Sequence, residues 1–307
     1  MTETLSQAET ATRSGFVALI GAPNAGKSTL VNQLVGSKVS IVTHKVQTTR
    51  ALVRGIATHA NAQIVLVDTP GIFRPRRRLD RAMVTTAWGG AKDADIVLMI
   101  LDAERGIRGD AEAILESLAE VRQPKVLVLN KIDRVDREKL LTLAAEANDK
   151  VKFDRTFMVS ALTGSGCADI LDYLAAELPP GPWYYPEDQI SDLPMRQLAA
   201  EITREKLYLR LHEELPYASH VVTEKWEEKQ NGSVRIEQTI YVERDSQKSI
   251  VLGHKGATIR AIGQASRTEI GAILEQPVHL FLFVKVRENW GDDPERYREM
   301  GLDFPGS

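Results

Sequence analysis

Apolar and polar residues alternate with two different periods along residues 15–178. Short apolar runs, typical of buried parallel strands, occur at 15–20, 62–68, 95–102, 124–130 and 155–160. The segments between them, such as 111–121 and 167–178, have the spacing of amphipathic helices. One interval differs, because 51–68 is typical of a hairpin of two adjacent strands. This order predicts a doubly wound, mostly parallel α/β domain with ligands bound at the carboxyl ends of its strands.

A proline-rich segment at 178–194 interrupts this pattern and predicts a linker. Beyond it we expect a helix at about 195–214, two strands joined across Asn231-Gly232, a short helix, a glycine turn, a helix at about 257–275 and a strand at 277–286. That order predicts a separate α+β domain. The chain therefore divides into a flexible tail (1–14), a first domain (15–180), a linker (181–194), a second domain (195–290) and a C-terminal tail (291–307).

The composition narrows the classes of function. A chain of 307 residues is long enough for two domains. The formal net charge of −3 excludes a protein that is basic overall, so any site for a polyanion must be a local patch. Cys167 is the only cysteine, which excludes an intramolecular disulfide and a cysteine-rich zinc site and favours a reducing compartment. No apolar run approaches the ~20 residues of a membrane span.

A phosphate-binding loop follows the first predicted strand. The stretch "GAPNAGKS" at 21–28 matches GxxxxGK[ST] and precedes a predicted helix. Backbone N–H groups of such a loop cradle phosphates, the lysine reaches the terminal ones and the Ser/Thr hydroxyl binds Mg²⁺. The residues expected at the nucleotide are Gly21, Ala22, Pro23, Asn24, Ala25, Gly26, Lys27, Ser28 and Thr29.

Three further motifs follow in order, each at the end of a predicted strand. They are Asp68, Thr69, Pro70 and Gly71 followed by Ile72; Asn130, Lys131, Ile132 and Asp133; and Ser160, Ala161 and Leu162. Asp68 can hold Mg²⁺ through water, and the Gly71 N–H can bond a γ-phosphate. The Asp133 carboxylate can accept hydrogen bonds from guanine N1–H and its amino group, a pair of donors that adenine lacks. The four motifs together predict a guanine-nucleotide site, with Asn130 and Lys131 bracing the base pocket and a backbone N–H of 160–162 meeting guanine O6.

Two further roles concern hydrolysis: a threonine that can complete the Mg²⁺ shell when GTP is bound, and a group that positions the attacking water. Thr49 in "KVQTTRA" is our choice for the Mg²⁺ ligand, with Thr48 as the alternative. Ile72 stands where many GTPases carry a water-orienting glutamine. Either hydrolysis is absent or another group substitutes, and Asn24 can hold a monovalent cation beside the phosphates or can only shape the loop. The predicted catalytic groups are Lys27, Asn24, Thr49 and Gly71.

A second glycine turn, "GHKG" at 253–256, lies in an interval without acidic residues between Asp245 and Glu269. Glycines let a sugar–phosphate backbone come close, and the following helix offers its N-terminus to a phosphate. Apolar residues on either side (Ile250, Val251, Ile259 and Ile262) can line a groove for unstacked bases. The residues expected at RNA are Lys248, Ile250, Gly253, His254, Lys255, Gly256, Ile259 and Arg260. The alternative is a plain joint between two helices.

Two other segments have both a functional and a structural interpretation. The arginines at 74 and 76–78 can touch RNA, but a solvated loop is the favoured interpretation. The aromatic residues at 183–185 can stack on bases, but packing of the linker against a domain is favoured.

The stretches "GAPNAGKSTLVNQLVG", "QTTR", "DTPG" and "NKID", followed by a hairpin and "VLGHKGATIRAIG", resemble the bacterial Era GTPases from about residue 15 to about residue 300. The resemblance implies a P-loop GTPase domain followed by a type II KH domain. It implies GTP/GDP and Mg²⁺ as ligands and hydrolysis aided by K⁺ at Asn24. It also implies binding to the 3′ end of 16S ribosomal RNA and assembly of the small ribosomal subunit by a cytoplasmic monomer with peripheral inner-membrane association.

Two alternatives to this function remain open at this point. The chain can be an RNA chaperone that uses GTP only as a structural ligand, and steady phosphate release would separate that function from a GTPase switch. It can also be a regulator of growth at the membrane surface, although it offers no lipidation motif and no strongly basic amphipathic helix.

Overall fold

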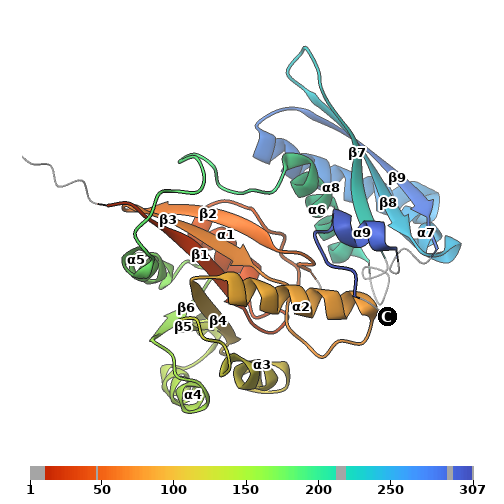
Figure 1. The fold of residues 1–307 in the computed structure, drawn as a ribbon. Coiled ribbons are helices and arrows are strands. Elements are labelled where there is room, and N and C mark those ends of the chain that lie inside the picture. The colour runs from red at the N-terminus through yellow and green to blue at the C-terminus, as the bar shows by residue number, and fades with distance from the viewer. Residues whose placement is uncertain (1–10, 46–47, 212–218, 289–292, 306–307) are drawn as a thin grey trace, which may run out of the picture.

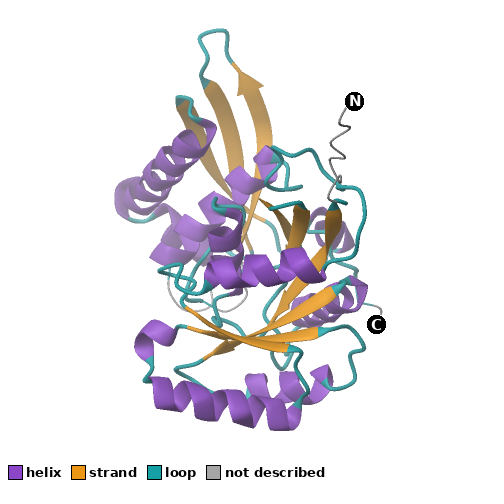
Figure 2. Cartoon of the chain, turned by 90° about the vertical axis from the view of Figure 1, so that its left-hand side faces the viewer, coloured by secondary structure: helices purple, strands orange, loops and turns teal. Residues whose placement is uncertain are grey.

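A computed structural model describes residues 11–45, 48–211, 219–288 and 293–305. These residues form two domains (Figure 1). Figure 2 shows that each domain has its own sheet. The tail expected at 1–14 falls largely outside the described residues. Among the helices that are described, none combines the length and the apolar character needed to cross a membrane.

The first domain is a six-stranded sheet between two layers of helices. Its strands are β1 (Arg13–Ile20), β2 (Val53–His59), β3 (Ala62–Asp68), β4 (Ile96–Asp102), β5 (Lys125–Asn130) and β6 (Arg155–Val159). Its helices are α1 (Lys27–Val35), α2 (Arg78–Asp93), α3 (Asp110–Leu118), α4 (Arg137–Lys150) and α5 (Cys167–Glu177), with a short 3₁₀ turn, η1 (Ile132–Arg134).

The strand order β2-β3-β1-β4-β5-β6 confirms the predicted doubly wound sheet. Only β2 runs antiparallel to its neighbour, which confirms the hairpin predicted at 51–68. Every residue of β3 and β4 is buried, as the uninterrupted apolar runs predict for strands covered on both faces. Because β3, β1, β4, β5 and β6 are parallel, the loops at their carboxyl ends gather at one edge of the sheet.

The apolar faces of the helices divide the core of this domain in two. Leu30 and Leu34 of α1 pack with Ile170 and Leu174 of α5 on one face of the sheet, where Cys167 is buried in the same cluster. Helices α2, α3 and α4 supply the cluster on the other face. The i, i+4 spacing of these leucine and isoleucine residues places them on one side of each helix.

The second domain is a three-stranded sheet covered by helices on one face. Its elements are α6 (Met195–Arg210), β7 (Ser219–Glu228), β8 (Val234–Val242), α7 (Asp245–Leu252), η2 (His254–Gly256), α8 (Ala257–Leu274) and β9 (Val278–Val286). The order α-β-β-α-α-β is the predicted one. Strand β8 lies between an antiparallel β7 and a parallel β9. Gly232 has φ 76° in the β7–β8 turn, a conformation that favours glycine.

The linker packs along the first domain. The backbone N–H groups of Tyr184 and Tyr185 donate to Gln63 Oε1 at 2.9 and 3.0 Å. The Tyr184 ring lies 5.0 Å from the ring of Phe16. These contacts confirm the favoured interpretation of the aromatic residues at 183–185 as linker packing.

The last described segment was not predicted from the sequence to have a fold of its own. Residues 294–299 form a short helix, α9 (Pro294–Glu299), and the chain from there to Phe304 packs against α2 of the first domain. Its acidic residues dominated the sequence pattern, and four apolar positions (Tyr297, Met300, Leu302 and Phe304) carry the packing.

Candidate nucleotide-binding and nucleic-acid-binding sites

The predicted phosphate loop connects β1 to α1 in a conformation that requires glycine. Gly26 has φ 98° and precedes the first residue of α1. A Cβ added to Gly26 would lie 2.2 Å from the side-chain nitrogen of Asn130. Asn24 also has a positive φ of 64°. The loop therefore turns sharply into the helix, and the free N–H groups at the start of α1 are available to an anion.

Lys27 is held inside this loop. Its Nζ donates to the carbonyl oxygens of Gly21 and Ala22 at 3.0 and 3.1 Å. Burial lowers the pKa of Lys27 to about 8, and the nearby Asp68 carboxylate opposes that shift. A phosphate bound in the loop would favour the charged form of the lysine.

Three side chains predicted at the metal converge at the end of β3. Asp68 Oδ2 accepts hydrogen bonds from Ser28 Oγ at 2.6 Å and Thr49 Oγ1 at 3.2 Å. The two hydroxyl oxygens lie 3.0 Å apart. Asp68 is fully buried, and this burial raises the pKa of its carboxyl group against the opposing effect of the hydrogen bonds. Its Oδ1 is buried and has no hydrogen-bond partner in the part of the chain that the structure describes.

This donor set fits a small hard cation. Mg²⁺ is bound in proteins through hydroxyl and carboxylate oxygens, waters and substrate phosphates. The orphaned Oδ1 of Asp68 is an acceptor that a water or an ion would satisfy. A fourth oxygen, Ser40 Oγ, donates to Asp68 Oδ2 at 2.6 Å. Ser40 was not predicted from the sequence, because it belongs to no motif and reaches Asp68 only through the path of the loop after α1.

The two candidate threonines face different ways. Thr48 Oγ1 lies 2.6 Å from Thr43 Oγ1 and donates to the Lys45 carbonyl at 2.7 Å. Only the Thr49 hydroxyl faces Ser28 and Asp68. The geometry therefore favours Thr49 over Thr48 as the cation ligand.

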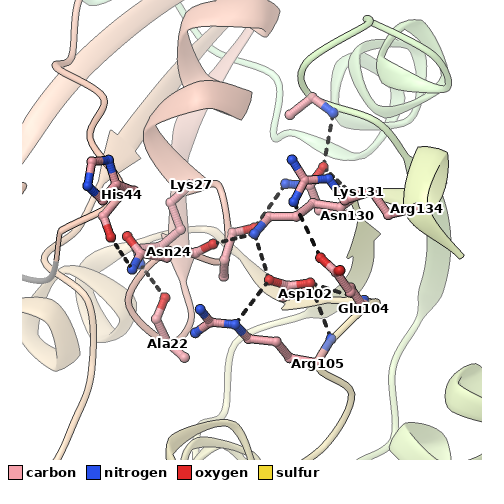
Figure 3. A network of polar contacts seen from close by, with 12 residues as sticks. Ala22, Asn24, Lys27, His44, Asp102, Glu104, Arg105, Asn130, Lys131 and Arg134 are labelled. Carbon is pink, nitrogen blue, oxygen red and sulfur yellow. Dashed lines mark hydrogen bonds and ion pairs between the residues drawn. The ribbon is translucent and has the colours of Figure 1, made fainter.

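Asn130 ties together three loops at the carboxyl edge of the sheet (Figure 3). Its Nδ2 donates to the Ala25 carbonyl at 2.9 Å. Its Oδ1 accepts the N–H groups of Lys131 and Ala161 at 2.8 and 2.9 Å. The asparagine thus joins the phosphate loop, the loop after β5 and the loop after β6 through hydrogen bonds that only an amide can make together.

Lys131 connects the phosphate loop to the end of β4. It has φ 68°, and its Nζ donates to the Asn24 carbonyl at 2.8 Å and to Asp102 Oδ2 at 2.6 Å (Figure 3). Asp102 was missed in the sequence, although it ends β4 at the same edge as the motifs. Asp133 lies in η1 with a carboxylate that is 31% exposed, so it is accessible to a ligand.

A cavity of about 370 Å³ opens beside this edge, between α1 and the loop after β6. It is lined by Thr29, Asn32, Gln33, Gly36, Ser37, Val42, Ala161 and Leu162. Three of these lining residues, Thr29, Ala161 and Leu162, are among the residues predicted to bind the nucleotide.

Ile72 and Asn24, the two residues linked to hydrolysis, make different contacts around the phosphate loop. The Ile72 side chain is buried in the core, and its N–H donates to the Gly21 carbonyl at 3.1 Å. Asn24 Nδ2 donates to the His44 carbonyl at 2.8 Å (Figure 3). Asn24 therefore connects the phosphate loop to the segment that leads to Thr49. This contact is compatible with both of its interpretations.

The segment 38–50, which carries Thr49, also contacts the second domain. Glu205 of α6 accepts a hydrogen bond from Lys38 Nζ at 2.7 Å and one from the Val42 N–H at 2.8 Å. The buried Arg50 guanidinium donates to the Tyr208 hydroxyl at 2.7 Å and to the Ser219 carbonyl at 3.0 Å. No sequence motif indicates these contacts, because they depend on how the domains pack.

The second glycine turn joins α7 to α8. Gly253 and Gly256 have φ 71° and 77°, and a Cβ on Gly253 would lie 2.1 Å from Thr258 Oγ1. His254 and Lys255 are exposed at the tip of the turn. Gly256 directly precedes α8, so the N–H groups of that helix point toward the turn.

The structure places the remaining candidates for RNA around this turn and corrects two of them. Ile250 and Arg260 are exposed, and Ile259 and Lys248 are partly exposed. Val251 and Ile262 are fully buried in the core of the second domain, so the expectation that they line a groove is wrong. Both lie on the inner sides of α7 and α8, and the spacing in the sequence does not distinguish inner from outer apolar residues at a joint.

Three of the four arginines at 74 and 76–78 fit the favoured interpretation of this segment as a solvated loop. Arg74, Arg76 and Arg77 are exposed, as expected for a solvated loop. Arg78 instead lies over the ring of Phe304, with its guanidinium carbon 4.9 Å from the ring centroid.

Comparison with known families matches a different family model to part of each domain. Residues 16–131 match the family described as 50S ribosome-binding GTPase, and residues 214–291 match the KH domain. The chain is 83% identical to GTPase Era of Mesorhizobium japonicum over 302 residues, covering 98% of this chain and 97% of that protein. It is 80% identical to GTPase Era of Rhizobium meliloti, covering 96% and 94%.

Two solved structures are similar over both domains. One is Era in complex with MgGDPNP and nucleotides 1506–1542 of 16S ribosomal RNA, and the other is an Aquifex aeolicus Era variant bound to GDP and AlF₄⁻. Each has a TM-score of 0.90 and 37% sequence identity, covering 94% of this chain and 99% of the other.

Proposed function

The chain belongs to the Era family of GTPases, and from that membership we propose that it is a Mg²⁺-dependent GTP-hydrolysing switch that binds the 3′ end of 16S ribosomal RNA and assists small-subunit assembly. The observation that carries the proposal is the convergence of Ser28, Thr49 and Asp68 beside the phosphate loop. These oxygens come from three separate motifs and meet at Asp68 Oδ2, while the buried Oδ1 of the same carboxylate has no hydrogen-bond partner among the described residues.

Each motif has a defined task in this proposal. Ser28 and Thr49 would bind Mg²⁺, which would offset charge on the phosphates, and Asp68 would hold it through water. Lys27 would turn from the loop carbonyls toward the β- and γ-phosphates, and the Gly71 N–H would bond the γ-phosphate. Asp133 would accept the two guanine donors, while Asn130 and Lys131 fix the loops around the base.

The experiment that tests the proposal is release of phosphate from GTP by the purified chain. We expect steady turnover with Mg²⁺ and a loss of at least about 100-fold when Mg²⁺ is chelated, since a metal clamp is worth several kcal/mol in the transition state. A Ser28→Ala variant removes one proposed metal ligand, and its rate of phosphate release in Mg²⁺ should therefore also fall. Tight GTP binding with no turnover in Mg²⁺ would instead favour the RNA chaperone.

We further propose that Asn24 holds K⁺ beside the phosphates. Support comes from Ile72, whose buried side chain cannot orient water, and from the position of Asn24 between the phosphate loop and the segment before Thr49. A cation there would offset developing charge as an arginine finger does.

The potassium site predicts a salt effect on turnover. GTP hydrolysis is expected to be at least about tenfold faster in K⁺ than in Na⁺ at equal ionic strength, because one cation contact in the transition state is worth a few kcal/mol. Asn24→Ala should lose most of that difference while retaining GTP binding. Equal rates in the two salts for both proteins would remove the potassium site from the proposal.

RNA binding is proposed at the glycine turn of the second domain. The exposed His254 and Lys255, the open N-terminus of α8 and the match to the KH domain support it. The Era structure with a 16S ribosomal RNA fragment shows that a relative of the same two-domain fold binds that RNA. Because ribosomal RNA is the proposed partner, we propose a cytoplasmic location, and the monomeric state stays a prediction. Peripheral association with the inner membrane stays a prediction.

A further inference from the structure

The end of the chain returns from the second domain to the first and packs on the segment that follows Gly71. We call residues 294–304 the C-terminal brace. Figure 1 shows α9 beside α2, although the two helices are far apart in the sequence. The brace and α2 share one apolar cluster, which is separate from the two clusters on the faces of the large sheet.

Tyr297 is the centre of this cluster. It is fully buried, and Leu302 is 3% exposed. Both pack with Leu79 and Met83 of α2. Complete burial of a tyrosine removes a large apolar ring from water and requires close packing around it. The brace is thus a specific contact with α2.

Phe304 and Arg78 extend the contact to the start of α2. The Phe304 ring lies 4.9 Å from the Tyr297 ring in an edge-to-face arrangement. Its face receives the Arg78 guanidinium, whose carbon lies 4.9 Å from the ring centroid. Arg78 is the first residue of α2, so the brace fixes the point at which the loop after Gly71 enters the helix.

The same loop is anchored at its other end by two successive residues. Ile72 is buried in the core of the first domain, whereas Phe73 packs against the cluster of the brace. Gly71 itself lies against the phosphate loop, where an added Cβ would be 3.0 Å from Pro23. Residues 71–73 are therefore held between the phosphate loop, the sheet and the brace.

The backbone of residues 71–73 matters more here than in a GTPase with a glutamine. Ile72 cannot orient water through its side chain, so the γ-phosphate and the water depend on the backbone groups of this segment together with the cation proposed at Asn24. Transition-state contacts depend on placement to within a fraction of an ångström. Resting on the GTP hydrolysis proposed above, we propose that the C-terminal brace positions this backbone for the reaction, with Tyr297 as its central positioning residue.

The test is steady-state hydrolysis by full-length variants in Mg²⁺ and K⁺. Tyr297→Ala is expected to lower kcat by about tenfold or more, because a displacement of the order of 1 Å costs up to about 100-fold. The KM for GTP should stay within about twofold, since the base and phosphate contacts lie elsewhere. Tyr297→Phe keeps the ring and should keep most of the wild-type kcat. Arg298→Ala, at the exposed next residue of α9, is the matched control and should be unchanged.

A second measurement separates positioning from general loss of stability. Phe73→Ala should lower kcat in the same way, and Phe73→Ala combined with Tyr297→Ala should lower it no further, because both act through one contact. If Tyr297→Ala fails to fold, Phe304→Ala makes the same test, since this ring is only partly buried and ends the brace. An unchanged or increased kcat in the folded variant, or fully additive losses, would overturn the proposal.

Discussion

Replacement of His254 and Lys255 by aspartate is expected to weaken binding of 16S 3′-end RNA by at least about 100-fold and to leave GTP affinity unchanged. Both side chains are exposed at the tip of the glycine turn, and both changes place negative charge where a phosphate backbone would pass. Unit charges about 4 Å apart interact by about 1 kcal/mol in water and by about 4 kcal/mol near a protein surface. The glycines remain, so the turn keeps its conformation.

The measurement is RNA affinity of the wild-type and variant proteins over a salt series. Wild-type affinity should fall as salt rises, because bound phosphates release counterions, and the slope should be modest because one turn contacts few phosphates. Lys139→Asp with Lys152→Asp adds negative charge at exposed sites of the first domain and serves as the control. If the turn variant folds, binds GTP and holds the RNA as tightly as the wild type, the turn is only a joint between helices.

The sequence predicts those parts of the molecule that depend on local pattern. The buried strands at 62–68 and 95–102, the β2–β3 hairpin and the Asn231-Gly232 turn follow from periodicity and turn chemistry within a few residues. Parallel strand order then brings the four nucleotide motifs to one edge. The geometry of Thr49 could not be obtained in this way, because its choice over Thr48 depends on which hydroxyl the loop turns toward Asp68.

The contacts between distant parts of the chain cannot be predicted from local patterns in the sequence. Glu205 on α6 is an ordinary acidic residue in an amphipathic helix until the fold places it beside Lys38 and the Val42 N–H. Tyr297 is likewise one aromatic residue in an acidic tail until it is buried against α2. Both residues contact segments that flank the nucleotide site. The second domain therefore holds the segment that carries Thr49, whereas the C-terminal brace holds the segment that follows Gly71.

Asp133→Asn is expected to lower GTP affinity by at least about 100-fold and to create binding of xanthosine triphosphate. In the proposed site the carboxylate accepts two hydrogen bonds from guanine, and hydrogen bonds to a charged group are worth about 1.5–3 kcal/mol each. The asparagine amide would face the guanine amino group with a donor. Xanthine carries an oxygen at that position, so the same amide would donate to it while its carbonyl accepts the ring N–H.

The environment of Asp133 makes this substitution a clean test. Its side chain is partly exposed, and Arg134 Nε, on a side chain that is 53% exposed, lies 3.8 Å from its Oδ2, so loss of the charge leaves Arg134 in contact with solvent. The loop is fixed by Asn130 and Lys131, which the variant retains. Asp136→Asn makes the same chemical change at a carboxylate that is 86% exposed, and it should bind GTP like the wild type. Titration of the three proteins with both nucleotides decides the matter, since GTP affinity that survives Asp133→Asn would place the guanine base elsewhere.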